Sequence, residues 1–214
     1  MATKLHLYGS DNLSIREVNP TGTDYIVDLS YFISNGDFNI VVEGSTATLA
    51  DRVRSWDAAI RSNQAHYTNL VAARASRTAQ KLAEEVSLGS LKGELEVLTA
   101  EQSVIIQALA LETTAAGKAT QQENLSRKNA EISSKNAAIA AQESVIANLQ
   151  AEIDRYAADI KAITEQLSFS EFFTDAEQKI LNLYLIEGDA TEETFVATDV
   201  DTAASGALST LQGN

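Results

Sequence analysis

The chain has 214 residues and carries 16 basic against 30 acidic side chains, for a formal net charge of −14. Because phosphate contacts need clustered lysine and arginine, this balance argues against nucleic-acid binding, and it also disfavours an anionic membrane surface. Cysteine is absent, which excludes disulfides, thiolate metal sites and a cysteine nucleophile. We expect no signal peptide, and every apolar run is far shorter than the roughly 20 residues that span a bilayer.

Residues 1–44 predict a small β-rich base segment. The alternating runs Lys4–Tyr8 and Leu13–Val18 predict two short strands, because turn residues follow each of them. The β-branched and aromatic run Tyr25–Ile33 and the run Phe38–Val42 predict a hairpin. Four short strands make a marginal core by themselves, so we expect this segment to pack on another part of the chain.

Residues 45–168 predict a coiled-coil arm whose first helix spans about 46–112 and begins near Thr48 and Asp51, which have capping-box spacing. Large apolar residues recur along this helix with the alternating three- and four-residue spacing of a coiled-coil seam. The seam positions on the first helix are Leu49, Val53, Trp56, Ile60, Tyr67, Leu91, Leu95, Leu98, Ile105 and Leu109.

The middle of the first helix interrupts this pattern. The seam phase falls there on Arg74, Arg77, Lys81 and Glu84, whereas Val71, Ala75, Leu82 and Val86 are about one residue out of step. We expect a local stutter, or an opening of the seam. We predict one long helix through this stretch. Glycines at 89 and 93 each cost roughly 1 kcal/mol inside a helix, so a break or kink near 89–93 would be the main departure from it.

A turn is predicted over 113–119 and a second helix over about 120–168. The seam of the second helix is formed by Leu125, Ile132, Ile139, Ile146, Leu149, Ile153, Tyr156, Ile160, Ile163 and Leu167. Before Ile146 only one apolar column continues, and the other column carries Lys128, Lys135 and Gln142, or Asn129 and Asn136 on the other flank. We therefore expect loosely specified packing in this half. Asn63, Asn129 and Asn136 either fix the register or face water.

Two arrangements of the helices fit this pattern. A hairpin has arms of up to about 50 residues, roughly 75 Å long, and puts the region of Leu167 opposite about Ala65. An extended rod instead takes its partners from identical chains. Aromatic residues concentrate before residue 68 and after 155, which favours the hairpin, with Trp56 meeting the phenylalanines that follow the second helix.

Residues 169–200 predict a short helix and a strand that return to the base, and 201–214 a flexible tail. The helix is expected from Asp175 to Ile186 with Gly188 ending it, and the strand at Thr194–Thr198. The base-packing residues are Phe169, Phe172, Phe173, Ile180, Tyr184 and Phe195. The predicted fold class is mainly α: a long antiparallel coiled-coil helical hairpin on a small β-rich base formed by the N- and C-terminal segments.

No catalytic, cofactor or metal motif is found along the chain. His6 and His66 are the only histidines, and neither has a Cys or His neighbour in the sequence. The acidic group Asp189, Glu192, Glu193, Asp199 and Asp201 lacks the oxygen spacing and mid-loop glycine of an EF-hand. We therefore predict a protein that is not an enzyme and has no cofactor.

Two segments resemble the tail-associated proteins of long-tailed phages and prophages, a family known as prophage endopeptidase tail or minor structural proteins. Phe169–Val200 is similar to the family's F-[TS]-x-E-E helix, acidic turn and N-F-V-x-T-D-like strand, although Thr194 replaces the asparagine. Asn19–Phe32 is similar to its N-P-x-G-x-x-Y-I-E-D-F-S-Y-F stretch. Together the segments cover about a fifth of the chain and flank the predicted arm, as in the family.

This resemblance implies a structural protein of the tail tip or baseplate that supports tail assembly or host contact. It implies a homo-oligomer, with a trimer favoured, together with other tail proteins and a host surface receptor as partners. The implied location is the virion, after synthesis in the bacterial cytoplasm. The family's large β-rich ring domain and its peptidase or lysin regions have no counterpart in these 214 residues. The chain is then a fragment of a longer protein or a reduced product, and endopeptidase activity is not carried over.

Two other functions remain open. A prefoldin-like coiled-coil chaperone or cellular scaffold would be favoured by an exposed apolar arm tip, but the predicted tip at 113–124 is polar and rich in alanine. An enzyme whose site forms only in an oligomer would need convergent titratable groups, and the chain has only two histidines.

Overall fold

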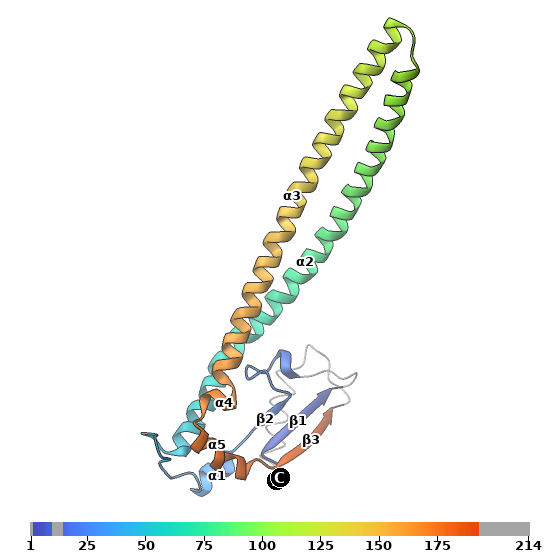
Figure 1. Cartoon of the computed structure of the whole chain (residues 1–214). Helices are drawn as coiled ribbons and strands as arrows, with labels where there is room; N and C mark the ends of the chain where they lie inside the picture. Colours follow the sequence, from blue (N-terminus) through green and yellow to red (C-terminus); the bar gives the residue numbers. More distant parts are fainter. Residues whose placement is uncertain (1, 10–14, 193–214) are drawn as a thin grey trace. The chain divides into compact units, whose positions relative to one another are not determined.

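A computed structural model describes residues 2–9 and 15–192 of the chain (Figure 1). The elements are β1 (Lys4–Gly9), a 3-10 turn η2 (Ile15–Glu17), β2 (Tyr25–Val27), α1 (Ser30–Asn35), α2 (Leu49–Leu111), α3 (Ala115–Leu167), α4 (Phe169–Phe172), α5 (Asp175–Leu181), a 3-10 turn η3 (Asn182–Tyr184) and β3 (Glu187–Glu192). The prediction of a mainly helical chain with two long helices is confirmed, and these helices pack together. The contacts define two units, residues 74–155 (the arm) and the described residues before 74 and after 155 (the base).

The sheet of the base joins the two ends of the described chain. Its strand order is β2-β1-β3, with β1 antiparallel to β2 and parallel to β3. Thr3 fixes the junction: its buried hydroxyl donates to the Tyr184 carbonyl at 2.6 Å and accepts the Ile186 N–H at 2.8 Å. Because these bonds and the β1–β3 ladder connect residues more than 180 positions apart, the base cannot form from either end alone.

The main core of the base surrounds the start of α2. Trp56 packs edge-on against Phe169 and Phe173, with ring centroids 5.8 and 5.5 Å apart, and its indole N–H donates to the Leu167 carbonyl at 2.8 Å. The polar end of this large side chain is therefore satisfied inside the core. The predicted meeting of Trp56 with the phenylalanines after the second helix is found at Phe169 and Phe173.

One buried ion pair fastens α5 to α2. Glu177 is 1% exposed, and its Oε1 accepts a hydrogen bond from Arg52 Nε at 3.1 Å. Its Oε2 accepts the N–H of Thr174, whose hydroxyl accepts the Glu177 N–H in return, which completes a capping box. The Arg52 guanidinium also donates to the Phe172 carbonyl and lies 4.8 Å from the centre of that ring. The carboxylate is therefore fully paired, as a buried charge must be.

The β predictions for the N-terminal segment are partly wrong. Ile15–Glu17 forms a 3-10 turn instead of part of a strand, because the Val18 and Asn19 N–H groups both bond to the Ile15 carbonyl. The Ile15 side chain is nevertheless buried, because it packs on Leu5 and Leu7 of β1 from the 3-10 turn.

The predicted hairpin of Tyr25–Ile33 and Phe38–Val42 is also wrong. The first strand ends at Val27, and α1 begins at Ser30, whose N–H donates to the Asp28 carboxylate. Gly36 ends this helix with a φ of 88°, a conformation that suits glycine. The second run forms only one isolated bridge, between Val41 and Thr48. Its Phe38 is fully buried among the aromatic rings of the core.

The start of α2 agrees with the predicted capping signal, since the Thr48 hydroxyl accepts the Asp51 N–H. The helix is continuous through Gly89 and Gly93, so the two glycines do not break the predicted long helix. The predicted turn of 113–119 is too long, because only residues 112–114 separate the helices. Folding back about three residues earlier than predicted also shifts the register, so that Leu167 lies beside Trp56 and not beside Ala65.

Glu112 and Thr114 explain the early start of α3. The Glu112 carboxylate accepts the N–H groups of Thr113 and Thr114, both at 2.9 Å, and the Thr114 hydroxyl accepts the Gly117 N–H at 3.0 Å. These bonds satisfy donors that a helix start leaves free. They also lower the pKa of Glu112 below its usual value, with the Thr114 N–H as the largest cause.

After α3 the chain departs from prediction at two places. The helix that starts at Asp175 ends at Leu181 and continues as the 3-10 turn η3, and Gly188 lies within β3 instead of ending a helix. Strand β3 itself was not predicted. The predicted strand Thr194–Thr198, the residue Phe195 and the tail 201–214 lie outside the described residues.

Candidate functional site

The candidate functional surface lies on the two helices of the arm. On both of its helices the less exposed residues keep an alternating three- and four-residue spacing. On α2 these half-buried positions are Arg74, Arg77, Lys81, Glu84, Leu88, Leu91, Leu95, Leu98, Gln102, Ile105 and Leu109. On α3 the corresponding positions, all half-buried except the buried Ile139, are Leu125, Lys128, Ile132, Lys135, Ile139, Gln142, Ile146, Leu149 and Ile153.

This spacing corrects the predicted stutter in α2. The phase continues through the charged residues Arg77, Lys81 and Glu84, while Leu82 and Val86 are 63% and 70% exposed. Long charged side chains fit a half-buried position because their aliphatic stems cover apolar surface while their charged ends reach water or a partner. The helix therefore keeps one inner face through this stretch.

Polar side chains connect the two helices along the inner face. Lys128 and Lys135 of α3 bind Glu101 and Glu94 of α2, with N–O distances of 2.8 and 2.5 Å. Four further contacts are Arg77–Glu152 at 2.6 Å, Lys92–Glu143 at 2.9 Å, Gln102–Asn129 at 2.6 Å and Gln142–Glu84 at 2.5 Å. Since residue numbers rise on α3 as they fall on α2, the helices run antiparallel.

Lys128 is the most heavily paired cation of this set. Its ammonium group also contacts Glu131 of its own helix at 2.5 Å. The hydrogen bond to Glu101, followed by that to Glu131, raises the pKa of Lys128 above its usual value. Of these two carboxylates only Glu101 belongs to the other helix, so the Lys128–Glu101 pair is the one that favours a relative position of the helices, although such exposed pairs individually contribute little stability.

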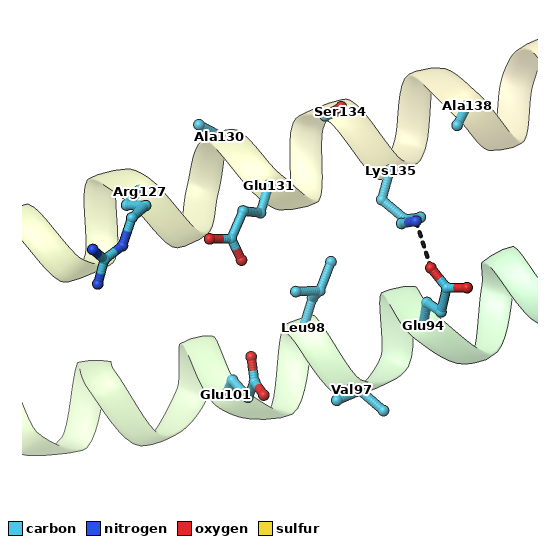
Figure 2. Close-up of a pocket in the computed structure, with 10 residues that line it drawn as sticks. All are labelled: Glu94, Val97, Leu98, Glu101, Arg127, Ala130, Glu131, Ser134, Lys135 and Ala138. Carbon is cyan, nitrogen blue, oxygen red and sulfur yellow. Dashed lines mark hydrogen bonds and ion pairs between the residues drawn. The ribbon is translucent and has the colours of Figure 1, made fainter.

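An open groove of about 740 Å³ lies between the two helices of the arm. Figure 2 shows Leu98 pointing toward α3, whereas Val97 on the same helix is turned away from it. Small side chains on α3 leave the space, and the ion pair of Lys135 with Glu94 borders it (Figure 2). The lining residues are Glu94, Val97, Leu98, Glu101, Arg127, Ala130, Glu131, Ser134, Lys135 and Ala138.

The structure places all predicted seam residues at buried or half-buried positions. The buried ones are Leu49, Val53, Trp56, Tyr67, Ile139, Ile160 and Leu167. The half-buried ones are Ile60, Leu91, Leu95, Leu98, Ile105, Leu109, Leu125, Ile132, Ile146, Leu149, Ile153, Tyr156 and Ile163. Of the predicted base-packing residues, Phe173 is buried, and Phe169, Phe172, Ile180 and Tyr184 are half-buried against the same core.

The three asparagines near the seam have different roles. Asn129 accepts a hydrogen bond from Gln102 across the helix pair, as a residue that fixes register would. Asn63 donates to the Ala59 carbonyl of its own helix, and Asn136 is exposed. The two possibilities left open by the sequence therefore apply to different residues.

Neither histidine belongs to a group that suggests chemistry. The Nδ1 of His6 lies 3.7 Å from the Asp24 carboxylate, and its ring packs against Tyr25. His66 is exposed on α2. Within residues 2–9 and 15–192, no group of three or more His, Cys, Asp or Glu side chains is arranged to hold a metal ion.

Sequence reasoning missed the outward apolar residues of the arm, among them Val86, Val97, Val104 and Leu111. Their signal is present in the sequence as a second series with the spacing of the seam, shifted by two positions. It also missed the pair of Arg52 and Glu177, because a separation of 125 residues leaves no local pattern.

Among the described helices, none is long and apolar enough to cross a membrane. Comparison of the chain with protein-family models, with curated proteins and with solved structures gives no significant match.

Proposed function

We propose that this chain is a non-catalytic virion structural protein of a phage tail tip or baseplate, or part of one, that supports tail assembly or host contact. It acts with copies of itself, three in the favoured assembly, and with other tail proteins. The resemblance of two segments to the tail-associated family motivates this proposal, and the way these segments pack supports it.

The observation that carries the proposal is the direct contact of the two family-like segments. Phe32, at the end of the first segment, packs edge-on against Tyr184 of the second, with ring centroids 4.8 Å apart. Both residues contact the core that contains Phe173 and Trp56. Segments about 140 residues apart in sequence thus form one base, in which α2 begins and α3 ends, as expected of motifs with a packing role.

The asparagine and glycine of the first segment also have structural roles. Asn19 donates to the carbonyls of Thr23 and Tyr25 and accepts from the Thr21 N–H, which closes the turn. Gly22 has a φ of 68°, and a Cβ there would lie 2.4 Å from Cγ2 of Thr164 on α3. The turn therefore needs these residue types for conformation and close packing, which agrees with a motif that carries no chemistry.

We further propose that α2 and α3 form a coiled coil. The alternating three- and four-residue burial on both helices and the ion pairs beside it are what such a structure requires. An experimental structure tests this, because each leucine or isoleucine of one inner face should insert between four side chains of the other helix. Flat contacts without such insertion would contradict the coiled coil.

Immunogold electron microscopy tests the tail proposal. An antiserum against the recombinant chain is applied to phage particles purified from the source bacterium after prophage induction. We expect gold at the end of the tail distal to the capsid, and none on particles treated with preimmune serum. Protein found only in the soluble cell extract, with unlabelled tails, would contradict the proposal.

One observation favours the chaperone as a second candidate. Leu111, beside the turn of the arm, is 82% exposed, and Val104, about two turns earlier, is 64% exposed. A client-binding arm would use such residues. In an aggregation assay with a thermally unfolded enzyme, a chaperone suppresses light scattering and Leu111→Ser reduces that effect. A tail protein leaves the scattering unchanged.

A further inference from the structure

Helix α2 carries a second, largely apolar face that is turned away from its inner face, although Val97 in it also lines the groove of the arm. Its members lie two positions after the residues of the inner face, which is a rotation of about 200° around a helix. This outer stripe consists of Ser76, Ala79, Ala83, Val86, Ser90, Gly93, Val97, Ala100, Val104, Gln107 and Leu111. Every member is exposed and none is charged. A heptad-spaced face without charge is typical of a helix with two partners and not one.

The matching face of α3 has a different character. Two positions after its inner residues, α3 carries Arg127, Asn148 and Arg155 among alanines and serines. Val97 and Val104 of α2 are 58% and 64% exposed, although valine is a weaker helix former than the charged residues that cover ordinary solvent faces. The uncharged outer face with its large apolar residues is thus a property of α2 alone.

Two glycines in the same stretch lack an explanation within the chain. A Cβ at Gly89 or Gly93 would meet no heavy atom within 4 Å. Each glycine weakens the helix by about 1 kcal/mol relative to alanine, and neither has a positive φ that would require it. Gly93 belongs to the outer stripe, and Gly89 lies beside it. Close approach of another backbone is the usual reason for glycine inside an element.

The net charges of the arm and of the rest of the chain indicate which kind of partner packs on the outer stripe. Residues 74–155 carry nine basic and eleven acidic side chains, so the net charge of the arm is −2, and the rest of the chain has −12. The carboxylates of Glu94 and Glu101, which border the stripe, are already paired with Lys135 and Lys128. A basic partner would therefore be attracted to the base. A second copy of the arm meets little repulsion.

The area of the outer stripe is large enough for the same stripe of a second copy to pack on it. The stripe spans 36 residues, or about 54 Å of helix, and with a helix diameter of about 10 Å it offers on the order of 500 Å² per copy. Two copies would bury about 1,000 Å², which is near the lower limit for a specific interface. We propose that α2 of a second copy packs on this stripe, with closest approach around Gly93. This contact does not depend on the tail assignment.

Light scattering coupled to size-exclusion chromatography tests this contact on the full chain. The wild-type chain should elute with a mass of two or three times 23.0 kDa, falling toward one copy on dilution. The double variant Val97→Lys/Val104→Lys should associate about 100-fold more weakly, because two ammonium groups enter an apolar contact. The matched control is Val145→Lys, an exposed valine of α3 outside the stripe, which should keep the wild-type mass.

Circular dichroism of the variants shows whether they fold, and it separates loss of contact from loss of structure. A wild-type chain that stays monomeric up to near-millimolar concentration overturns the proposal. A double variant that keeps the wild-type mass, or a control that loses it while the double variant does not, also overturns it.

Gly93→Ala provides a second test, because its effect on helix stability and its effect on association are expected to have opposite signs. In the monomeric double variant it should raise the melting temperature, since alanine favours a helix. In the wild-type background it should weaken association about tenfold, because the new methyl group separates the two helices. An unchanged dissociation constant overturns the close contact. Gold labelling of tails is unaffected by either result, so the tail assignment and the contact through the outer stripe can fail independently.

Discussion

The base and the arm are stabilised by different kinds of contact. The base has a core of fully buried large side chains, among them Phe38, Phe173, Leu49 and Leu181. In the described arm the most buried apolar side chain, Ile139, is still 8% exposed, and the remaining contacts are half-buried side chains and ion pairs between helices. An arm of two helices cannot enclose a core. It is held together instead by many similar contacts repeated along its length.

This difference matters for how substitutions act. A buried aromatic in the base touches many neighbours, and its loss leaves a cavity that cannot collapse. A leucine on the arm loses fewer contacts, and solvent fills the space. Stability is therefore concentrated in the base, whereas the arm distributes it over many positions.

The largest expected effect comes from truncation in the two regions. Phe173→Ala should lower the free energy of unfolding by about 3–5 kcal/mol, because it removes a 2% exposed ring that contacts Trp56. Leu98→Ala in the arm should cost about 1–2 kcal/mol, since this side chain is half-buried. Urea denaturation followed by circular dichroism measures both values. Equal losses in the free energy of unfolding at the two positions would contradict the claim that stability is concentrated in the base.

The turn that contacts α3 is expected to show the next largest effect. Gly22→Ala should cost about 2 kcal/mol, because alanine is strained at a φ of 68° and its Cβ collides with Thr164. Thr164→Ala combined with Gly22→Ala should recover part of this loss by removing the colliding methyl group. Thermal denaturation of the single and double variants provides the measurement. If the second substitution recovers nothing, the turn does not rest on α3 as described.

The polar inner face of the arm allows a stabilising substitution. Lys135→Leu should raise the free energy of unfolding by about 1 kcal/mol, because leucine at a half-buried position gains apolar contact and Glu94 can turn to water. Ser133→Leu, at an exposed position of α3 that does not line the groove, is the control and should change stability little. Destabilisation by Lys135→Leu would mean that the ion pair contributes more than the packing it displaces.

The smallest effects are those of pH. The pKa of Glu112 in the arm and of Glu187 in the base is lowered, by the Thr114 N–H and by Lys4 respectively. Their contributions are complete above the unfolded pKa of about 4.5 and are lost as the pH falls through the lower folded values. The pKa of Lys128 is raised, so its contribution is complete below 10.5 and is lost at higher pH.

Melting temperature measured against pH tests these directions. Glu112→Gln should flatten the acidic decline slightly, because one of the groups that must be protonated is gone. A steeper decline in this variant would contradict the capping role of the Glu112 carboxylate. Glu123→Gln, an exposed carboxylate near the start of α3, is the matched control.

The helices of the arm were predictable because their signal repeats. Ile132, Ile139 and Ile146 each report the same face, so one irregular residue does not hide it. The short turn was missed because the cap formed by Glu112 and Thr114 depends on side-chain geometry, which composition does not reveal. In the base each strand has only a few residues, and tertiary contacts decide among the local choices.

Phe38 and Ile15 illustrate that second case. Both lie in runs that favour strands, yet one fills a core of aromatic rings and the other packs on β1 from a 3-10 turn. The charged stretch of α2 was misjudged for a related reason. Apolar residues were assumed to mark the inner face, whereas Leu82 and Val86 point outward and the stems of Arg77 and Lys81 take the inner positions.

The parallel pairing of β1 with β3 has a consequence for folding during synthesis. Lys4 pairs with Glu187, so strand β1 waits for its neighbour until β3 has emerged from the ribosome. At 5–20 residues per second this delay is on the order of ten to forty seconds. The two long helices form from local contacts in the meantime, and by folding back they shorten the loop whose closure the sheet requires. The sheet of the base therefore closes only after the long helices have been synthesised, although the base holds the most deeply buried side chains of the described chain.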